Sequence, residues 1–184
     1  MRFLIAIFVL WAVSLSAPPV RADQNAPELE QLFQQLHDAP NPKAARPIEQ
    51  RIWHFWMSHE DNAVNVLMGT GIEQMAQRDY DAALATFKEM ADIAPEFAEA
   101  WNKRATVEWL LGDYQDSLSD IDKTLALEPR HFGALSGRGL VYTSLEEWDR
   151  ALEAFEDALQ VYPQMIGPRV NAEAIRQMLE RREI

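Results

Sequence analysis

The segment from Ala98 to Pro129 reads AEAWNKRATVEWLLGDYQDSLSDIDKTLALEP. Apolar residues recur at helical spacing before and after its Gly112-Asp113 pair, which predicts two helices joined by a turn. We expect Asp113 to cap the second helix, because an aspartate side chain can accept a hydrogen bond from a free backbone N–H group. Pro129 cannot continue a helix interior, so it marks the end of the pair. The segment therefore predicts one antiparallel helical pair.

This pair is one of three copies that follow one another with a period of 34 residues. A small residue in each first helix would let the paired helix approach closely. A single pair cannot bury its apolar face, so the copies are expected to stack on one another. Five columns keep the period: Pro95, Pro129 and Pro163; Tyr80, Tyr114 and Trp148; Gly71, Ala105 and Gly139; Ala83, Ser117 and Ala151; Phe87, Ile121 and Phe155.

On these columns the sequence resembles the tetratricopeptide repeat family, in copies at 64–97, 98–131 and 132–165. The resemblance implies an all-α fold, a right-handed α-solenoid of antiparallel helix pairs. The helices are expected at about 62–77, 80–93, 96–111, 114–127, 130–145 and 148–161.

The first residues have the order of a secretory signal peptide. Arg2 precedes a short apolar run, and Val20-Arg21-Ala22 has the small-x-small pattern of a cleavage site. We expect cleavage after Ala22 and a periplasmic mature protein; a retained membrane anchor is the alternative, although the run is short for a membrane span. Cleavage would change the net charge from −12 to −14, because residues 1–22 contain two arginines and no acid.

The acidic balance argues against two classes of partner. Nucleic acids and anionic lipid headgroups are bound largely through positive protein charge, which is in deficit here. We therefore expect no nucleic acid and, after cleavage, no membrane as partners. The chain has no cysteine, so disulfides, thiol catalysis and lipid attachment through cysteine are excluded.

Both ends of the array are expected to be helical. The segment 23–61 predicts a divergent hairpin, with helices near 27–38 and 44–59, that caps the first repeat. The segment 166–184 predicts a terminal helix that covers the last repeat. Its apolar stripe is expected to consist of Val170, Ala174, Ile175, Met178 and Leu179.

The stretch RIWHFWMSHED, Arg51 to Asp61, admits three interpretations: a packing face, a ligand surface or a metal site. We favour packing, because Ile52, Phe55 and Trp56 share one side of a helix and Trp53 widens it. This helix is expected to lie between its hairpin partner and the first repeat. Asp61 is placed to cap the helix that follows.

We find no pattern that predicts catalysis, a cofactor or a metal site. The histidines are His37, His54, His59 and His131, and their spacing does not bring three ligands together. The Gly-x-Gly pairs at 69–71 and 137–139 fall within expected helices, without the preceding strand and lysine of a phosphate loop. Ser136 lacks the strand-to-helix turn of a nucleophile.

Arg104 and Arg138 occupy a column where the family most often has leucine. The resemblance implies that Arg104 pairs with Asp120 on the second helix of its repeat, as a structural ion pair. An anion-binding arginine in the groove is the alternative. For Arg138 the partner is open between Glu153 and Asp122.

The family binds extended peptides or helices in a concave groove lined by each first helix. The positions that chaperone-binding members use to clamp a carboxylate hold Met68, Ile72, Gly133 and Gly137, so this clamp is absent. A largely apolar peptide-binding groove is expected instead. Its residues are Asn65, Met68, Ile72, Met75, Glu99, Asn102, Thr106, Trp109, Ser136, Leu140 and Thr143.

Three functional hypotheses follow. The first is an exported adaptor that binds a protein or peptide partner in envelope assembly or protein maturation. The second is a structural protein that self-associates or fills its own groove, as a monomer or homo-oligomer. The third is an accessory subunit of an envelope enzyme.

Overall fold

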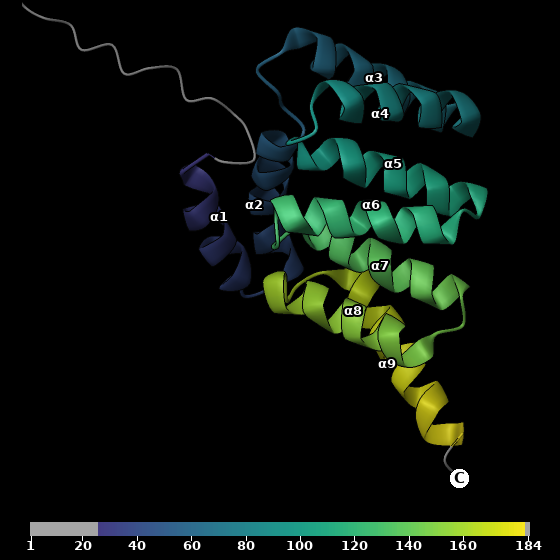
Figure 1. Cartoon of the computed structure of the whole chain (residues 1–184). Coiled ribbons are helices and arrows are strands. Elements are labelled where there is room, and N and C mark those ends of the chain that lie inside the picture. The colour runs from purple at the N-terminus through teal and green to yellow at the C-terminus, as the bar shows by residue number, and fades with distance from the viewer. Residues whose placement is uncertain (1–25, 183–184) are drawn as a thin grey trace, which may run out of the picture.

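The computed structural model describes residues 26–182, and within that range it contains nine α-helices and no strand (Figure 1). The signal-peptide prediction, residues 1–22, lies outside the described residues. No helix among the described residues is long and apolar enough to cross a membrane. The helices are α1 (Glu28–His37), α2 (Pro42–Trp56), α3 (Asn62–Ala76), α4 (Tyr80–Ile93), α5 (Ala98–Leu111), α6 (Tyr114–Leu127), α7 (Phe132–Ser144), α8 (Trp148–Val161) and α9 (Ile166–Arg182).

Helices α3 to α8 form three antiparallel pairs, α3–α4, α5–α6 and α7–α8, which stack in order into an α-solenoid. The helix bounds agree with the expected ones to within two residues. The small-residue column explains the tight pairing. A Cβ atom placed on Gly71 would lie 2.4 Å from the Phe87 ring, and one on Gly139 would lie 2.5 Å from the Phe155 ring.

The turn inside each pair uses one left-handed residue in the same repeat position. These residues are Arg78 (φ 62°), Gly112 (φ 89°) and Glu146 (φ 59°), and they are 34 residues apart. Only the middle one is glycine, the residue that adopts this conformation without steric cost. The expected cap by Asp113 is wrong: its side chain accepts no capping hydrogen bond. Its backbone N–H instead donates to the Glu108 carbonyl, as the turn geometry dictates.

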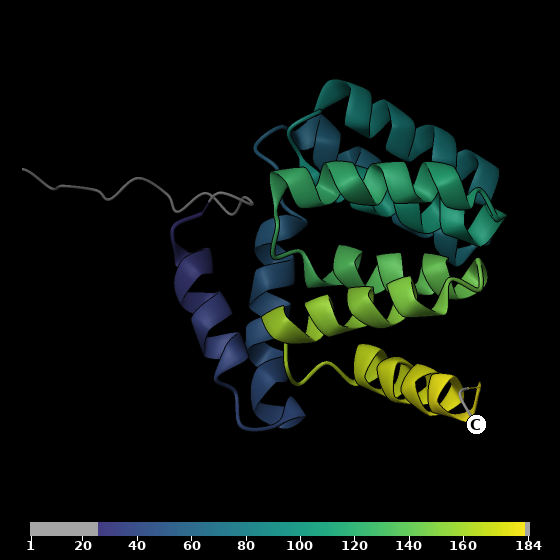
Figure 2. The same cartoon turned by 60° about the horizontal axis from the view of Figure 1, so that its bottom comes forward.

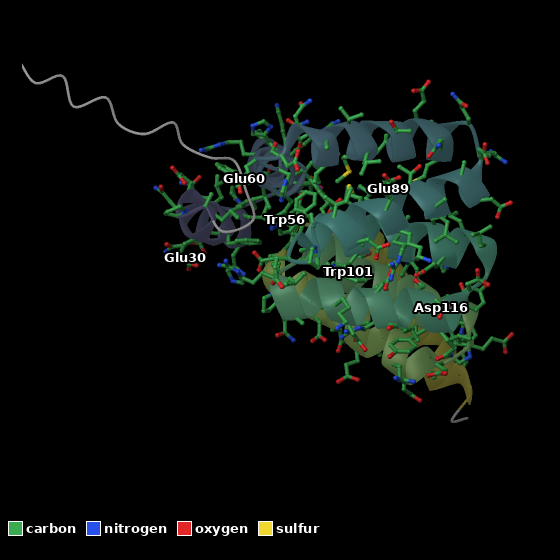
Figure 3. All side chains as sticks on the ribbon, turned by 45° about the horizontal axis from the view of Figure 1, so that its top comes forward. Glu30, Trp56, Glu60, Glu89, Trp101 and Asp116 are labelled. Carbon is green, nitrogen blue, oxygen red and sulfur yellow. The ribbon has the colours of Figure 1, made fainter. Side chains whose placement is uncertain are left out.

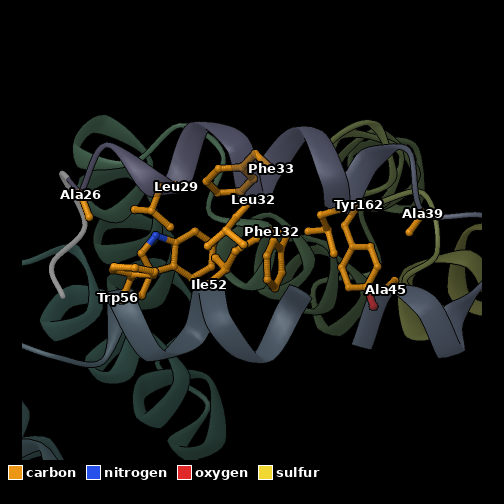
Figure 4. Close-up of a cluster of buried hydrophobic side chains, with 12 residues drawn as sticks. Ala26, Leu29, Leu32, Phe33, Ala39, Ala45, Ile52, Trp56, Phe132 and Tyr162 are labelled. Carbon is orange, nitrogen blue, oxygen red and sulfur yellow. The ribbon is translucent and has the colours of Figure 1, made fainter. Parts of the chain in front are cut away.

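The α1–α2 hairpin lies along one side of the stack rather than on its first repeat (Figures 1 and 2). Its core includes Trp56, Phe132 from the start of α7 and Tyr162 from the end of α8 (Figure 4). The expectation that α2 is wedged against the first repeat holds only near its C-terminal end, where Met57 packs on that repeat's cluster. The hairpin therefore bridges the turns between repeats.

Polar contacts also hold the hairpin along the side of the stack. Gln164 Nε2 donates to the Ala39 carbonyl at 3.0 Å, and Arg130 Nη1 lies 2.7 Å from Glu30 Oε2. The Arg130 guanidinium also lies over the Phe33 ring, 4.1 Å from its centroid. At the far end of the hairpin, the Asp61 side chain caps α3 by accepting from Ala63 N at 2.8 Å.

Helix α9 packs on α8 and covers the last repeat. Ile175, Met178 and Leu179 belong to the cluster at this contact, as the sequence indicated. The other two residues of the expected stripe do not, because Val170 is 60% exposed and Ala174 is also exposed. Pro168 and Ala172 are buried instead of Val170 and Ala174. Helix α9 is therefore rotated about its axis relative to the expectation, so that Pro168 and Ala172 face α8.

The arginine column forms ion pairs within the repeats. Arg104 meets Asp120 through two contacts, Nε to Oδ2 at 2.5 Å and Nη2 to Oδ1 at 2.6 Å. Arg138 meets Asp122 at 2.6 Å, which is one of its two candidate partners. Glu108 Oε1 lies 3.5 Å from Arg104 Nε, and the Glu108 residue is only 7% exposed. The Arg104 guanidinium is therefore engaged by protein carboxylates.

Candidate functional site

A small cavity lies between α5 and α7, the first helices of the second and third repeats. Its volume is about 170 Å³. Five of the eleven expected groove residues line it, from two repeats that lie side by side in the stack. They are Asn102, Thr106, Trp109, Ser136 and Leu140.

The cavity combines an apolar interior with hydroxyl and amide groups, and its lining contains no charged side chain. Seven further residues complete the lining: Ala105, Ser117, Ile121, Gly133, Gly137, Val141 and Met165. Small residues are essential here, because they leave the space unfilled. A Cβ atom on Gly137 would have its nearest neighbour 3.9 Å away, in the Ile121 side chain.

Trp109 is the largest side chain at the cavity, and it is half-buried. Its indole Nε1 donates to Ser144 Oγ on α7 at 3.0 Å, which fixes the ring across the two helices. Thr106 is also held, because its hydroxyl donates to the Asn102 carbonyl at 2.9 Å. The cavity therefore has a preformed apolar wall, an arrangement that suits a ligand side chain.

Three of the expected groove residues are not open binding surface. Met68 is 4% exposed and packs in the core of the first repeat. Glu99 is 1% exposed, because the α2 helix and its tryptophans cover this end of the stack. Asn65 is bound by its own chain: its side chain donates to the His59 carbonyl at 2.7 Å and accepts from His59 N at 2.9 Å.

The remaining expected residues lie outside the cavity lining. Ile72 is 37% exposed and Met75 is half-buried, both on α3. Thr143 is half-buried, and its hydroxyl donates to the Gly139 carbonyl at 2.7 Å. Sequence reasoning missed Met165, which enters the cavity from the turn after α8. Its repeat position follows the closing proline, so no helical periodicity identified it.

A buried polar network connects this cavity to the hairpin. Asn102 Nδ2 donates to Glu99 Oε2 at 3.0 Å, and His131 Nε2 lies 2.8 Å from the same oxygen. His131 Nδ1 accepts from Ala134 N at 3.0 Å, so Nε2 carries the proton that it donates to Glu99. Lys103 Nζ lies 2.8 Å from Glu99 Oε1.

Burial by itself would raise the pKa of Glu99. The Lys103 charge and the His131 hydrogen bond outweigh burial and hold that pKa below its ordinary value. Glu99 is therefore an ionised anchor inside the protein, and its carboxylate is not presented to a ligand. Sequence spacing alone did not predict this contact, because Glu99 and His131 lie at opposite ends of one repeat, 32 residues apart, and meet only in the folded chain.

The hairpin closes the end of the groove where the first helices begin. A Cβ atom on Gly133 would lie 2.8 Å from the Trp53 ring, so the indole rests directly on this glycine. Lys103 Nζ lies over the same ring, 5.4 Å from the centroid. Figure 3 shows Trp56 at this junction of hairpin and stack. The open part of the groove is consequently the part around Trp109 and Leu140.

The structure brings no metal-binding cluster together among residues 26–182. In that range His59 tilts against Phe97, with 5.0 Å between ring centroids, and its Nδ1 accepts from Asp61 N at 3.1 Å. His37 contacts the Gln160 carbonyl at 3.1 Å. The stretch from Arg51 to Asp61 serves in packing, since Ile52 and Trp56 are almost fully buried.

Comparison with known proteins supports the repeat interpretation. Two tetratricopeptide repeat models match residues 68–123 and 96–164, and together they span more than half of the chain. The chain therefore belongs to the tetratricopeptide repeat family. A TPR repeat-containing protein of Rhizobium etli is 36% identical over 135 residues, which cover 73% of this chain and 66% of the relative.

Other relatives match a smaller share of their length. The Hsp70-Hsp90 organizing protein 1 of Glycine max is 30% identical over 93 residues, which are 50% of this chain and only 16% of that protein. The chain thus spans less than two thirds of the curated relatives that it matches here.

Solved structures show the same fold. The Sgt2 TPR domain from Aspergillus fumigatus superposes with a TM-score of 0.63 at 19% identity, covering 67% of this chain and 83% of that one. The first TPR of Spaghetti (RPAP3), bound to an HSP90 peptide, gives 0.61 at 24% identity, covering 64% and 93%. MamA gives 0.61 at 20% identity, covering 77% and 81%.

Proposed function

We propose that this protein is an adaptor that binds a segment of another protein in the open part of the groove. The observation that carries the proposal is the preformed cavity between α5 and α7, where Trp109 and Leu140 provide an apolar wall and Thr106 and Ser136 provide hydroxyl groups. Such a combination suits one apolar anchor residue of a bound segment, with its backbone near the polar rim.

The solved relatives suggest the mode of binding but not the partner. Spaghetti was solved with an HSP90 peptide, whose sequence SRMEEVD contains three acidic residues and ends in aspartate. The cavity of the present chain has no lysine or arginine in its lining, and Trp53 covers Gly133 at one end. We therefore infer a partner segment that is anchored by an uncharged apolar side chain rather than by a terminal carboxylate.

The place of action is part of the same proposal. Arg2, the apolar run after it and Val20-Arg21-Ala22 support export and cleavage, and thus a periplasmic role in envelope assembly or protein maturation. A fusion of residues 1–26 to a reporter that is active only after export tests this part. An inactive reporter would contradict it.

Site-specific crosslinking tests the groove. A photoreactive amino acid in place of Trp109 is expected to label a partner in intact cells, whereas the same residue at the exposed Ser119 on α6 is the matched control. The label at position 109 must disappear when Gly137→Leu fills the cavity and must persist with Gly137→Ala, which leaves most of it open. Equal labelling from positions 109 and 119, or labelling that ignores Gly137→Leu, would overturn the proposal.

Self-association gives a different result in the same experiment. If the groove is occupied by another copy of the chain, the crosslinked product has twice the mass of the protein and contains only its peptides. Mass spectrometry of the product separates the two functions.

A further inference from the structure

The outer face of α3 is an inter-repeat face that no helix within residues 26–182 covers. In Figure 1, α3 and α4 form one end of the stack, and the hairpin lies at its side. In each later repeat, the first helix packs against the second helix of the preceding repeat, as α5 does on α4 and α7 on α6. Helix α3 has no such predecessor.

Equivalent positions in the three repeats show that α3 lacks the covering helix that α5 and α7 have. Val66 is 58% exposed, whereas the equivalent Ala100 and Ala134 are 0% and 1% exposed. Glu73 is exposed, whereas the equivalent Val107 and Val141 are 0% and 1% exposed. The same columns are buried in α9 as well, at Pro168 and Ile175, because α8 covers them. The exposure is therefore specific to the first repeat.

Helix α3 has the composition of a helix with neighbours on several sides. It contains a single charged residue, Glu73, in fifteen residues. Its Gly69 also has open space around it, since a Cβ atom there would meet nothing within 4 Å. Val66 and Gly69 thus expose uncharged surface beside the single charge of Glu73, and we treat this surface as a candidate for interaction.

The established inter-repeat contact defines the shape of the occupant. In the two later repeats the first helix is covered by one helix of the preceding repeat, α4 on α5 and α6 on α7. The second helices of the described repeats, α4, α6 and α8, are already packed within their own repeats. Within residues 26–182, a second copy of the protein therefore offers no free second helix.

The charges around α3 define the chemistry of the occupant. Residues 61–79, which form α3 and its flanks, hold three acids and one base, and the chain as a whole has a net charge of −12. Asp61 and Glu73 lie near opposite ends of the helix and are both exposed. Two α3 helices packed together would place acid near acid in either orientation, which opposes self-pairing.

We propose that the open face of α3 docks a basic amphipathic helix of another protein, which takes the place of the second helix of a preceding repeat. Its apolar stripe covers Val66, and a lysine or arginine meets Glu73, which is seven residues after Val66 and lies on the same face of α3. This site is separate from the cavity at Trp109, so either proposal can fail without the other.

The test uses a helix-stapled peptide as the probe. It carries the α4 sequence, residues 80–93, with the exposed Asp81, Glu89 and Asp92 replaced by lysine. The unaltered α4 peptide is the charge control. The full-length chain should bind the lysine peptide more tightly than the control, and the difference should shrink as salt rises.

Two variants locate the site. Val66→Asp is expected to weaken binding of the lysine peptide at least tenfold without lowering the thermal midpoint, since Val66 is 58% exposed. Val170→Asp, at a residue 60% exposed on α9, is the matched control and should bind like the parent. Equal binding by both variants, or no preference for the lysine peptide, would overturn the proposal. A dimer that Val66→Asp disperses in sedimentation would also overturn it, since the occupant would then be a second copy.

Discussion

The imidazole of His131 stacks on the indole of Trp56, with ring centroids 4.1 Å apart and planes 10° from parallel. The two residues are 75 positions apart in the sequence: Trp56 precedes the first repeat, and His131 is the last residue of the second. His131 also holds Glu99 at 2.8 Å. This contact attaches the hairpin to the repeats and brings a buried carboxylate, an imidazole and an indole together.

Trp56→Ala is expected to lower the free energy of unfolding by about 3–5 kcal/mol. Trp56 is 1% exposed and contacts Phe33, Phe132 and His131, so its removal leaves a cavity at the centre of the hairpin contact. Urea titration followed by circular dichroism measures the loss. His54→Ala, at an exposed residue of the same helix, is the control and should be nearly silent. Equal losses in the two variants would contradict the packing assignment.

Asp120→Ala is expected to destabilise the protein, because it leaves the Arg104 guanidinium without its two-point partner. Loss of a partner from a buried pair costs about 3–5 kcal/mol, but Glu108 lies 3.5 Å from Arg104 Nε and can take part of the contact. We therefore expect a loss of about 2–3 kcal/mol, with a larger loss when Asp120→Ala is combined with Glu108→Gln.

The control for this pair is the equivalent ion pair of the third repeat. Asp122, which meets Arg138, has a side chain that is 72% exposed, so Asp122→Ala should change stability by less than about 0.5 kcal/mol. Thermal unfolding of these three variants and the parent protein gives the comparison. A loss at Asp120 no larger than that at Asp122 would show that Arg104 and Asp120 are only a surface pair.

Glu108→Gln should stabilise the protein in a pH-dependent manner. Burial, followed by the charge of Asp120, raises the pKa of Glu108 from 4.5 to about 7. A folded pKa above the unfolded one means that the folded state favours the proton, so the parent loses stability as pH rises from about 4.5 to about 7. The amide has no charge to bury.

The difference between the variant and the parent is therefore expected to be small at pH 4.5 and to reach on the order of 1–3 kcal/mol at pH 8. Unfolding midpoints in urea across this range measure it. A difference that does not change between pH 4.5 and pH 8 would mean that Glu108 titrates as an ordinary exposed acid.

Substitutions at two of the three left-handed turn residues should change the stability of the protein in opposite directions. Gly112→Ala forces a Cβ atom into φ 89° and should cost about 1 kcal/mol. Glu146→Gly relieves the same strain at φ 59° and should be neutral or stabilising by up to about 1 kcal/mol. Paired thermal melts decide the question, and a stabilising Gly112→Ala would be incompatible with this turn geometry.

Local patterns in the sequence predicted the repeats well, because each repeat is determined by contacts between near neighbours. Gly71 and Phe87 are sixteen positions apart, and their column recurs in every copy. The helix bounds therefore followed from periodicity. For the site, periodicity identified the faces that meet at the cavity, such as Thr106 and Leu140, but not which members of each face remain open.

The exposure of each groove residue depended on the position of the hairpin, which the repeat pattern does not predict. Glu99 was expected in the groove but is buried, because α2 covers the start of α5 and His131 binds its carboxylate. Met165 was not expected but lines the cavity, because the turn after α8 reaches it.

The sequence by itself determined the class of fold, the three repeats and the bounds of their helices to within two residues, since helical periodicity and a period of 34 are local properties of the chain. The tertiary structure decided the rest. It placed the hairpin along the turns between repeats, buried Glu99 and His131 beneath Trp56, and left Val66 exposed on α3. These outcomes depend on contacts between segments that are distant in sequence, whose geometry no local pattern specifies.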